Sequence, residues 1–217
     1  AMGLFMVGYC TTVNFAIYYM KYIFGNEGMY VILVAVCGVA QLSALAVYPA
    51  FAKRFNRKQL YTISTVLVLA GYFVFFFAEV SIILVAFGAV LVFVGQAFIQ
   101  TLMLMFLADT VEYGQWKLGK RNESITFSIQ PLINKIGGAI ATGVVSMTLI
   151  IAHVKVDGGT ADMIGSSDKL IIKLAMFVLP LICIVAGYII YMKKYKISEE
   201  YYAKILADLQ EREKVSG

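Results

Sequence analysis

Charged residues are scarce in this chain, and their scarcity excludes an ordinary soluble domain. Only 14% of the 217 residues are Asp, Glu, Lys or Arg, whereas a soluble domain carries about a quarter. Hydrophobic residues make up 61%, and the mean hydropathy is +0.82. The sequence therefore predicts an integral membrane protein. Its net charge of +5 indicates loop topology rather than nucleic-acid binding, because no basic face interleaved with aromatic residues is present.

Cysteine and histidine are rare as well. The three cysteines all lie in apolar segments without metal-ligand spacing, so neither a disulfide framework nor a metal site is expected. The single histidine, His153, ends an apolar segment, and we interpret it as an interfacial residue rather than a ligand. No nucleophile–base pair or phosphate-binding loop is present, so we expect neither an enzyme nor a cofactor. The chain opens with Ala1 and shows no signal peptide, and we expect a piece of a longer protein.

Six apolar stretches are each near or above the length that crosses a hydrocarbon core of about 30 Å. Such long stretches favour helices over the alternating ten-residue strands of a membrane barrel. The predicted fold is an all-α membrane protein with six transmembrane helices in residues 1–192 and a separate tail in 193–217. The predicted spans are 3–24, 29–52, 60–78, 81–108, 125–152 and 170–192.

Basic residues alternate along the predicted loops. Lys and Arg gather in 53–58, in 109–123 and at the start of the tail, whereas the intervening loops are poor in both. The positive-inside rule places the basic segments in the cytoplasm. We therefore expect a multi-pass protein of the plasma (inner) membrane with both termini cytoplasmic.

The tail is predicted to be an amphipathic helix. Ser198 can cap it, and apolar residues recur every four positions on an otherwise charged segment, at Ile197, Tyr201, Ile205 and Leu209. We interpret it as a surface helix packed on the cytoplasmic face. A helix that binds a partner is the alternative.

Lys135 is the most informative single residue. It lies about ten residues inside the apolar stretch Ile125 to Ile151, near the membrane midplane, where a charge costs roughly 2.5–3.5 kcal/mol. A small and polar stripe extends from it along one helix face, and Gln130 and Asn134 flank the stripe. We interpret the stripe as the lining of a substrate pathway, with lipid or packing on the opposite face. Helix packing with a structural ion pair is the alternative. The stripe comprises Ser124, Ser128, Pro131, Lys135, Gly138, Thr142 and Ser146, and the opposite face comprises Ile125, Ile129, Leu132, Ile136 and Ile140.

Three further polar residues lie deep in predicted spans. Gln96 and Gln100 are one turn apart at about mid-depth, and Asn14 lies in the first span. Buried amides need hydrogen-bond partners. Gln96 and Gln100 can bind a neighbouring helix or a polyhydroxylated ligand, whereas for Asn14 helix packing is favoured.

The predicted loop 109–123 carries charges of both signs. The acidic residues Asp109, Glu112 and Glu123 accompany Lys117, Lys120 and Arg121. Such charges can form an ion-pair network that closes one side of a transporter and opens in its other state. A solvated loop that sets topology is the alternative.

The loop and the lysine-bearing helix resemble a known family. The pattern D-x-V-E-Y-G-x-x-K-x-G-x-R-x-E-S, followed by Gln130-Pro-Leu-Ile-Asn-Lys135, is similar to the glycoside–pentoside–hexuronide:cation symporters, the family of the melibiose permease. The tail, from Ser198 to Arg212, also resembles the C-terminus of that family. The resemblance covers essentially the whole chain. It implies the second six-helix half of a transporter with the major facilitator fold.

The resemblance also implies sugar transport coupled to Na⁺ or H⁺ by alternating access. Lys135 would be the pathway lysine, with Gln130 and Gln100 near the sugar. No acid lies deep in any span, so the coupling cation is expected to bind mainly to the absent N-terminal half. The cytoplasmic network would comprise Asp109, Glu112, Tyr113, Gly114, Lys117, Arg121 and Glu123. Two alternatives stay open, a stand-alone six-helix scaffold or interaction protein and a related transporter of non-sugar amphiphiles such as lysolipids.

Overall fold

The computed structural model describes residues 1–78, 81–120, 122–154, 164–195, 197 and 199–216. Helices make up most of the described chain, and these residues contain no strand. In order, the elements are α1 (Met2–Tyr18), the π-helix η1 (Tyr19–Ile23), α2 (Met29–Arg54), α3 (Arg57–Phe77), α4 (Ile82–Leu118), α5 (Glu123–Ile151), α6 (Ser166–Lys194) and α7 (Glu199–Ser216).

Five of these helices, α2 to α6, are long and apolar enough to cross a membrane. The first predicted span, 3–24, is divided between α1, which has 17 residues, and η1, which continues it for five more. The prediction of an all-α membrane protein is confirmed, and the count of six spans holds when α1 and η1 are taken as one.

The predicted loop 109–123 is wrong over most of its length, because α4 continues to Leu118. The helix ends at Gly119, which adopts a left-handed conformation with φ 68° and whose N–H bonds to the carbonyl oxygen of Gln115 at 2.9 Å. Glycine adopts this conformation without steric cost. Three of the charges that indicated a loop, Asp109, Glu112 and Lys117, belong instead to the last turns of α4, which leave the apolar part of the bundle.

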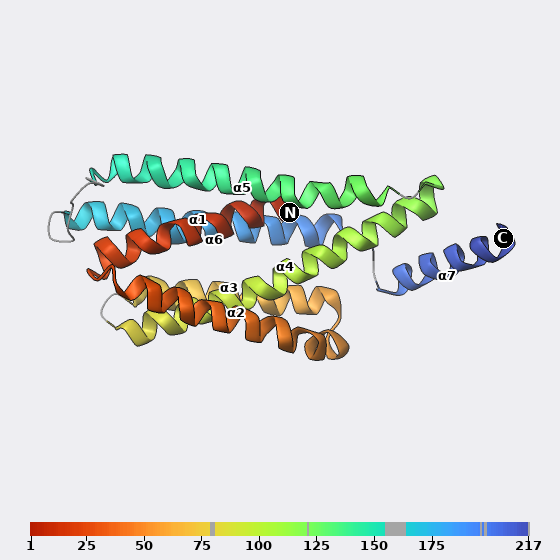
Figure 1. Ribbon diagram of the computed structural model, residues 1–217, viewed down its shortest axis with the longest axis horizontal. Helices are drawn as coiled ribbons and strands as arrows, with labels where there is room; N and C mark the ends of the chain where they lie inside the picture. Colours follow the sequence, from red (N-terminus) through yellow and green to blue (C-terminus); the bar gives the residue numbers. More distant parts are fainter. Residues whose placement is uncertain (79–80, 121, 155–163, 196, 198, 217) are drawn as a thin grey trace.

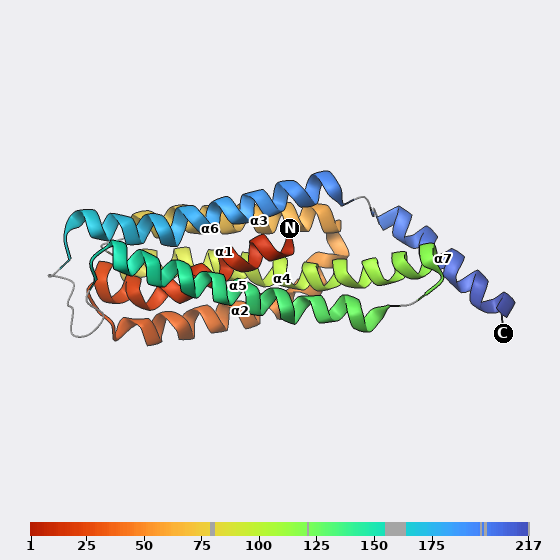
Figure 2. The same ribbon diagram turned by 90° about the horizontal axis from the view of Figure 1, so that it is seen from above.

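The helices lie side by side in an elongated bundle, with α5 at one edge and α2 and α3 at the opposite edge (Figure 1). α3 packs most extensively on α4, whereas α1 packs on α5 and α6 (Figures 1 and 2). The α3–α4 contact is close because Gly71, Gly88 and Gly95 leave no side chain between the two backbones. The rings of Tyr19 in η1 and Phe177 in α6 pack edge-on with centroids 5.8 Å apart, which supports the core between these two elements.

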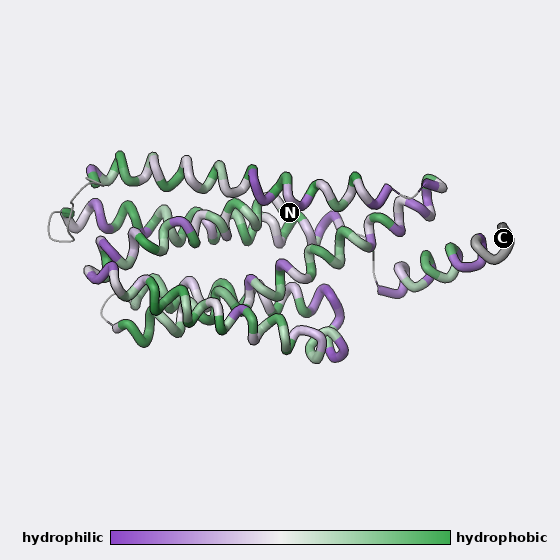
Figure 3. The backbone as a smooth tube through the Cα atoms, in the orientation of Figure 1, coloured by the Kyte–Doolittle hydropathy of each residue, from purple (hydrophilic) through white to green (hydrophobic). Residues whose placement is uncertain are grey.

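Hydrophilic residues gather at the two ends of the bundle and along α7 (Figure 3). We call the end that carries 54–57, 118–120, 122–123 and the start of α7 the tail end. The described residues of all three basic segments lie there (Figure 1), as their alternation requires. The side of the membrane on which this end lies stays a prediction.

α7 contacts the extension of α4 through its apolar stripe. Ile205 is only 1% exposed, and the Tyr201 ring meets that of Trp116 edge-on. The Trp116 indole donates a hydrogen bond to Asp208 at 3.0 Å. The tail is thus a helix packed on the tail end, although its expected cap, Ser198, lies outside the described residues.

Candidate functional site

The first candidate region is the polar stripe of α5. This helix is buried along Gly137, Ala141 and Val145, which face α1 and the rest of the bundle. The stripe and the face of Ile129 and Ile136 are both exposed in this chain. The expected polar face and the expected apolar face are therefore both outer faces, and a third face, which the sequence analysis did not single out, makes the contact with α1.

Lys135 lies far from the tail end along the length of α5. It follows the first residue of α5, Glu123, by 12 positions, which is about 18 Å of helix. Its side chain is exposed, as is that of Asn134, whereas Gln130 is half-buried. None of the ion pairs between described residues includes Lys135. Its ammonium therefore opens onto a face that this chain leaves uncovered.

Asn14 joins α1 to the same stripe. Its amide nitrogen donates to the Thr142 hydroxyl at 3.3 Å, and that hydroxyl donates to the Gly138 carbonyl oxygen at 3.0 Å. This contact agrees with the packing role favoured from the sequence. It also places a polar α1 side chain beside the stripe, seven residues along α5 from Lys135.

A second polar group joins α1, α2 and α4. The hydroxyl of Tyr9 on α1 lies close to the amides of Gln100 on α4 and Gln41 on α2. All three side chains are partly exposed. Gln100 was expected to contribute here, but Tyr9 and Gln41 were missed. Gln41, an isolated amide in an apolar span, carried the same signal that singled out Gln100.

Gln96 lies apart from this group. It is 1% exposed, and neither atom of its amide has a hydrogen-bond partner among the described residues. A buried amide without partners is unfavourable. Gln96 is therefore buried, whereas Gln100, one turn further along α4, is partly exposed.

The tail end holds a cluster of charged residues and tyrosines. Asp109 is 2% exposed and forms an ion pair with Arg57, the first residue of α3. The Tyr195 hydroxyl, just beyond α6, donates to the same carboxylate oxygen at 2.9 Å. α3, α4 and the end of α6 therefore converge on Asp109. Arg121, which the sequence suggested as a member of this network, lies outside the described residues.

The start of α7 joins this cluster. The backbone N–H of Arg57 donates to the Glu199 carboxylate at 2.8 Å, and its guanidinium lies 5.0 Å from the centroid of the Tyr202 ring. Burial, together with a hydrogen bond to the Glu112 carboxylate, raises the pKa of Tyr202 to about 12. The tail helix is thus attached to the same residues that close around Asp109.

The other predicted network residues lie around this cluster. The ammonium of Lys117 is 5.7 Å from the centroid of the Tyr113 ring, and Glu123 is exposed in the first turn of α5. Gly114 has open space where a side chain would stand. The structure therefore places Asp109 and Glu112 together, and Lys117, Tyr113 and Gly114 along the outer turns of α4.

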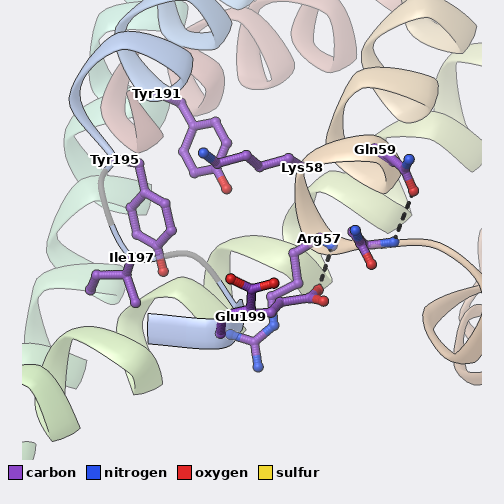
Figure 4. A pocket seen from close by; sticks show the side chains of 9 residues that line it. Arg57, Lys58, Gln59, Tyr191, Tyr195, Ile197 and Glu199 are labelled. Carbon is purple, nitrogen blue, oxygen red and sulfur yellow. Dashed lines mark hydrogen bonds between the residues drawn. The ribbon is translucent and has the colours of Figure 1, made fainter. Parts of the chain in front are cut away.

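A cavity of about 450 Å³ opens beside the cluster, between the starts of α3 and α7 and the end of α6. Lys58 extends toward Tyr191 across it, and Glu199 lies beside Arg57 (Figure 4). The Tyr191 hydroxyl has no hydrogen-bond partner among the described residues. The cavity is lined by polar residues of three elements and adjoins the joint between α6 and the tail.

Lys173 of α6 was also missed by the sequence reasoning. It is 8% exposed, and its ammonium lies 4.2 Å from the centroid of the Phe76 ring. A cation over an aromatic face is favourable, especially where it is desolvated. Its position inside the predicted span 170–192 was the available signal, although Lys135 lies closer to the middle of its own span.

A bundle of long apolar helices with polar residues at mid-depth defines a multi-pass membrane protein. Residues 2–199 match the family described as "MFS/sugar transport protein". This chain belongs to that family of transporters.

Curated relatives are carriers. The chain is 35% identical over 194 residues to the lactose permease of Lactobacillus delbrueckii subsp. bulgaricus, covering 89% of this chain and 31% of the permease. It is 36% identical over 194 residues to the raffinose carrier protein of Pediococcus pentosaceus, covering 89% and 30%. It is 25% identical over 203 residues to the glucuronide carrier protein homolog of Escherichia coli K12, covering 92% and 43%.

These matches confirm the expected resemblance to the glycoside–pentoside–hexuronide:cation symporters. The chain spans about a third of the length of the lactose and raffinose carriers. The activity of a complete protein of this kind is therefore a matter for proposal.

Proposed function

We propose that this chain is the C-terminal six-helix half of a secondary active transporter that carries a neutral oligosaccharide, such as lactose or raffinose, together with Na⁺ or H⁺. The names of the relatives support the substrate class, and the shared family supports the half-transporter architecture. Alternating access would expose one central site to each side of the membrane in turn.

The uncovered polar face is the observation that carries this proposal. Lys135, the Asn14–Thr142 pair and the Tyr9–Gln41–Gln100 group all reach the surface of this half at membrane depth. Polar groups facing lipid are costly, so a second half is needed to cover them. The amides, the phenol and the hydroxyl supply the donors and acceptors that sugar hydroxyls require.

Lys135 would act as the positive charge of this site. An ammonium near the midplane is tolerated where water, a ligand or a carboxylate of the other half surrounds it. Since the described spans hold no acid beside it, we place the coupling cation on carboxylates of the other half. The residues proposed to line the pathway in this half are Lys135, Gln130, Asn134, Gln100 and Asn14, with Tyr9 and Gln41 added by their contacts. Gln96, which was expected among them, is left out because it is only 1% exposed.

The tail-end cluster would close the cytoplasmic side. Asp109 and Glu112 link α4 to α3 and to α7 through Arg57 and Tyr202, so a change in the helix ends would break several contacts together. This proposal retains Tyr113, Gly114, Lys117, Arg121 and Glu123 as its outer members. It assumes that both termini are cytoplasmic in the inner membrane.

Uptake by the complete gene product tests the proposal. Vesicles that carry it should accumulate labelled lactose or raffinose when a Na⁺ or pH gradient is imposed. Lys135→Ala should abolish accumulation but not membrane insertion, which the loss of a midplane charge favours. Ile140→Ala, on the exposed apolar face of the same helix, is the matched control and should retain uptake.

Other outcomes of this uptake experiment would support the two alternative functions. Transport of lysolipids instead of sugars would identify a carrier of amphiphiles. Absence of transport for every substrate, with a complete protein of only six spans, would identify a scaffold and refute the proposal.

A further inference from the structure

A groove on the opposite edge from α5 lies between α2 and α3, with α4 as its floor. α2 packs on α4 and scarcely touches α3, which leaves a cavity of about 390 Å³ between them. Its walls include Val47 and Phe51 of α2 and Ile63 of α3, all of them exposed, and Gly95 and Phe98 lie on its floor.

The groove offers no polar group to a sugar. The Ser43 hydroxyl donates to the Val39 carbonyl oxygen at 2.8 Å, and the Ser64 hydroxyl donates to the Leu60 carbonyl oxygen at 2.7 Å. Both hydroxyls on its surface are thus used by their own helices. The occupant must therefore be apolar over the length of the groove.

The length of the groove matches one leaflet of the bilayer. From Ala40 to Phe51 along α2 is 11 residues, or about 16 Å, and half of the hydrocarbon core is about 15 Å. The groove begins near mid-bilayer depth and ends one helical turn before the tail end. An extended acyl chain has this reach.

The tail end of the groove is basic. Arg54 follows Phe51 by three residues and Val47 by seven, a spacing that places it on the groove face of α2. Lys53 lies next to it, and both are exposed in the last turn of the helix. The N-terminal end of α3, with its partial positive charge, begins at Arg57 on the same side. An anionic headgroup at this level would meet these charges.

We propose that the groove between α2 and α3 binds one anionic phospholipid, with an acyl chain against α4 and its headgroup at Lys53 and Arg54. Basic sites between membrane helices on the cytoplasmic side suit anionic headgroups. The site lies across the bundle from the α5 stripe (Figure 1), so it is separate from the proposed sugar pathway and does not depend on the sugar. Its occupant would stabilise the weak α2–α3 contact.

Native mass spectrometry of the purified complete gene product tests the headgroup contact. Phosphatidylglycerol and phosphatidylcholine with identical chains are titrated in parallel, and phosphatidylglycerol should bind more tightly. Each basic residue near an anionic headgroup contributes about fivefold, so Lys53→Gln with Arg54→Gln should weaken phosphatidylglycerol binding about 25-fold. The matched control, Lys193→Gln with Lys194→Gln, removes the basic pair from the last turn of α6 and should change it less than twofold.

A second pair of variants tests the acyl contact. Ser43→Phe fills the groove and should weaken binding of both lipids, whereas Val39→Phe, one turn away and 66% exposed outside the groove, should not. Equal binding of the two lipids, or equal effects of the two basic pairs, would refute the proposal.

Thiol labelling distinguishes a bound lipid in the groove from another segment of the protein. In a background without other cysteines, Ser43→Cys and Val39→Cys should both react with a lipid-soluble maleimide in delipidated protein, and added phosphatidylglycerol should protect only Ser43→Cys. If Ser43→Cys is unreactive even after delipidation, another segment of the protein covers the groove, and the lipid proposal is wrong.

Discussion

Replacement of Asp109 by Asn tests whether the tail-end cluster holds α3, α4 and α6 together. The carboxylate accepts hydrogen bonds from Arg57 and Tyr195 on a single oxygen. Asn keeps the size and one acceptor of Asp but loses the charge. The Asp109 side chain is 3% exposed and that of Arg57 is 24% exposed, so water can solvate the unpaired guanidinium only in part.

The magnitude follows from this partial burial. Exposed ion pairs contribute at most about 1 kcal/mol, whereas removing one partner of a buried pair costs about 3–5 kcal/mol. Asp109→Asn should therefore cost about 2–3 kcal/mol, which corresponds to a factor of about 30 to 150 in an equilibrium constant. Asp168→Asn is the matched control, because its only described ion-pair partner, the exposed His153, is 4.0 Å away.

A double-mutant cycle measures the pair directly. Denaturant unfolding of the complete protein is compared for Asp109→Asn, Arg57→Gln and the double variant. Direct partners should show a coupling energy of about 2 kcal/mol, whereas independent sites add within about 0.5 kcal/mol. Additive effects would refute the assignment of Arg57 as the partner of Asp109. If the cluster also closes this side during transport, Asp109→Asn should slow uptake more than it weakens sugar binding.

Two further changes test packing. Gly95→Ala should destabilise the α3–α4 contact by about 1–3 kcal/mol, because the added methyl group would lie 2.7 Å from the Ser64 carbonyl oxygen. The matched control is Gly143→Ala, which meets open space and should not lower the unfolding midpoint. Ile205→Asp should release α7 from the tail end, because it buries a charge at a site that is 1% exposed; a red shift in the fluorescence of Trp116 should report the release, and the exposed Ala207→Asp should cause none.

The number and type of the helices could be predicted because apolar length alone determines them. Uninterrupted stretches such as 29–52 and 170–192 have few other solutions in a bilayer. The end of α4 could not be predicted in the same way. Hydropathy falls at Asp109, yet the helix continues to Leu118, where Asp109 pairs with Arg57 and α7 packs on the extension. Hydropathy marks where a helix leaves the bilayer, which is not where its hydrogen bonds end.

The partner of Asp109 was missed for a related reason. The sequence indicated a network among the charges of 109–123, whereas the structure brings Arg57 from 52 residues away. Arg57 had been interpreted only as part of a topology signal. Charge patterns show which residues need partners, but the choice among several nearby cations depends on how the helix ends meet in space.

The same distinction applies to the polar residues at mid-depth. Lys135 and Gln100 could be selected individually because each is expensive in lipid. Their grouping could not be predicted, since Tyr9 and Gln41 are ordinary membrane residues until α1 and α2 bring them to Gln100. Gln96, which looked equivalent to Gln100, is instead buried within this chain. The energetic cost of a polar residue in lipid allows it to be identified from the sequence. The helix face on which it lies determines which groups it can bind.

These contacts explain why the polar face is both well defined and incomplete. α5 contacts the bundle through Gly137, Ala141 and Val145, so its orientation is fixed by small residues and does not depend on Lys135. The lysine is thereby held exposed without any stabilising partner from the described residues. Such an arrangement is unfavourable in isolation and becomes favourable only when a second half, with its water and ligands, covers the stripe. The unfavourable free energy of this exposed polar face is therefore the physical basis for proposing that the chain functions at an interface with a second half.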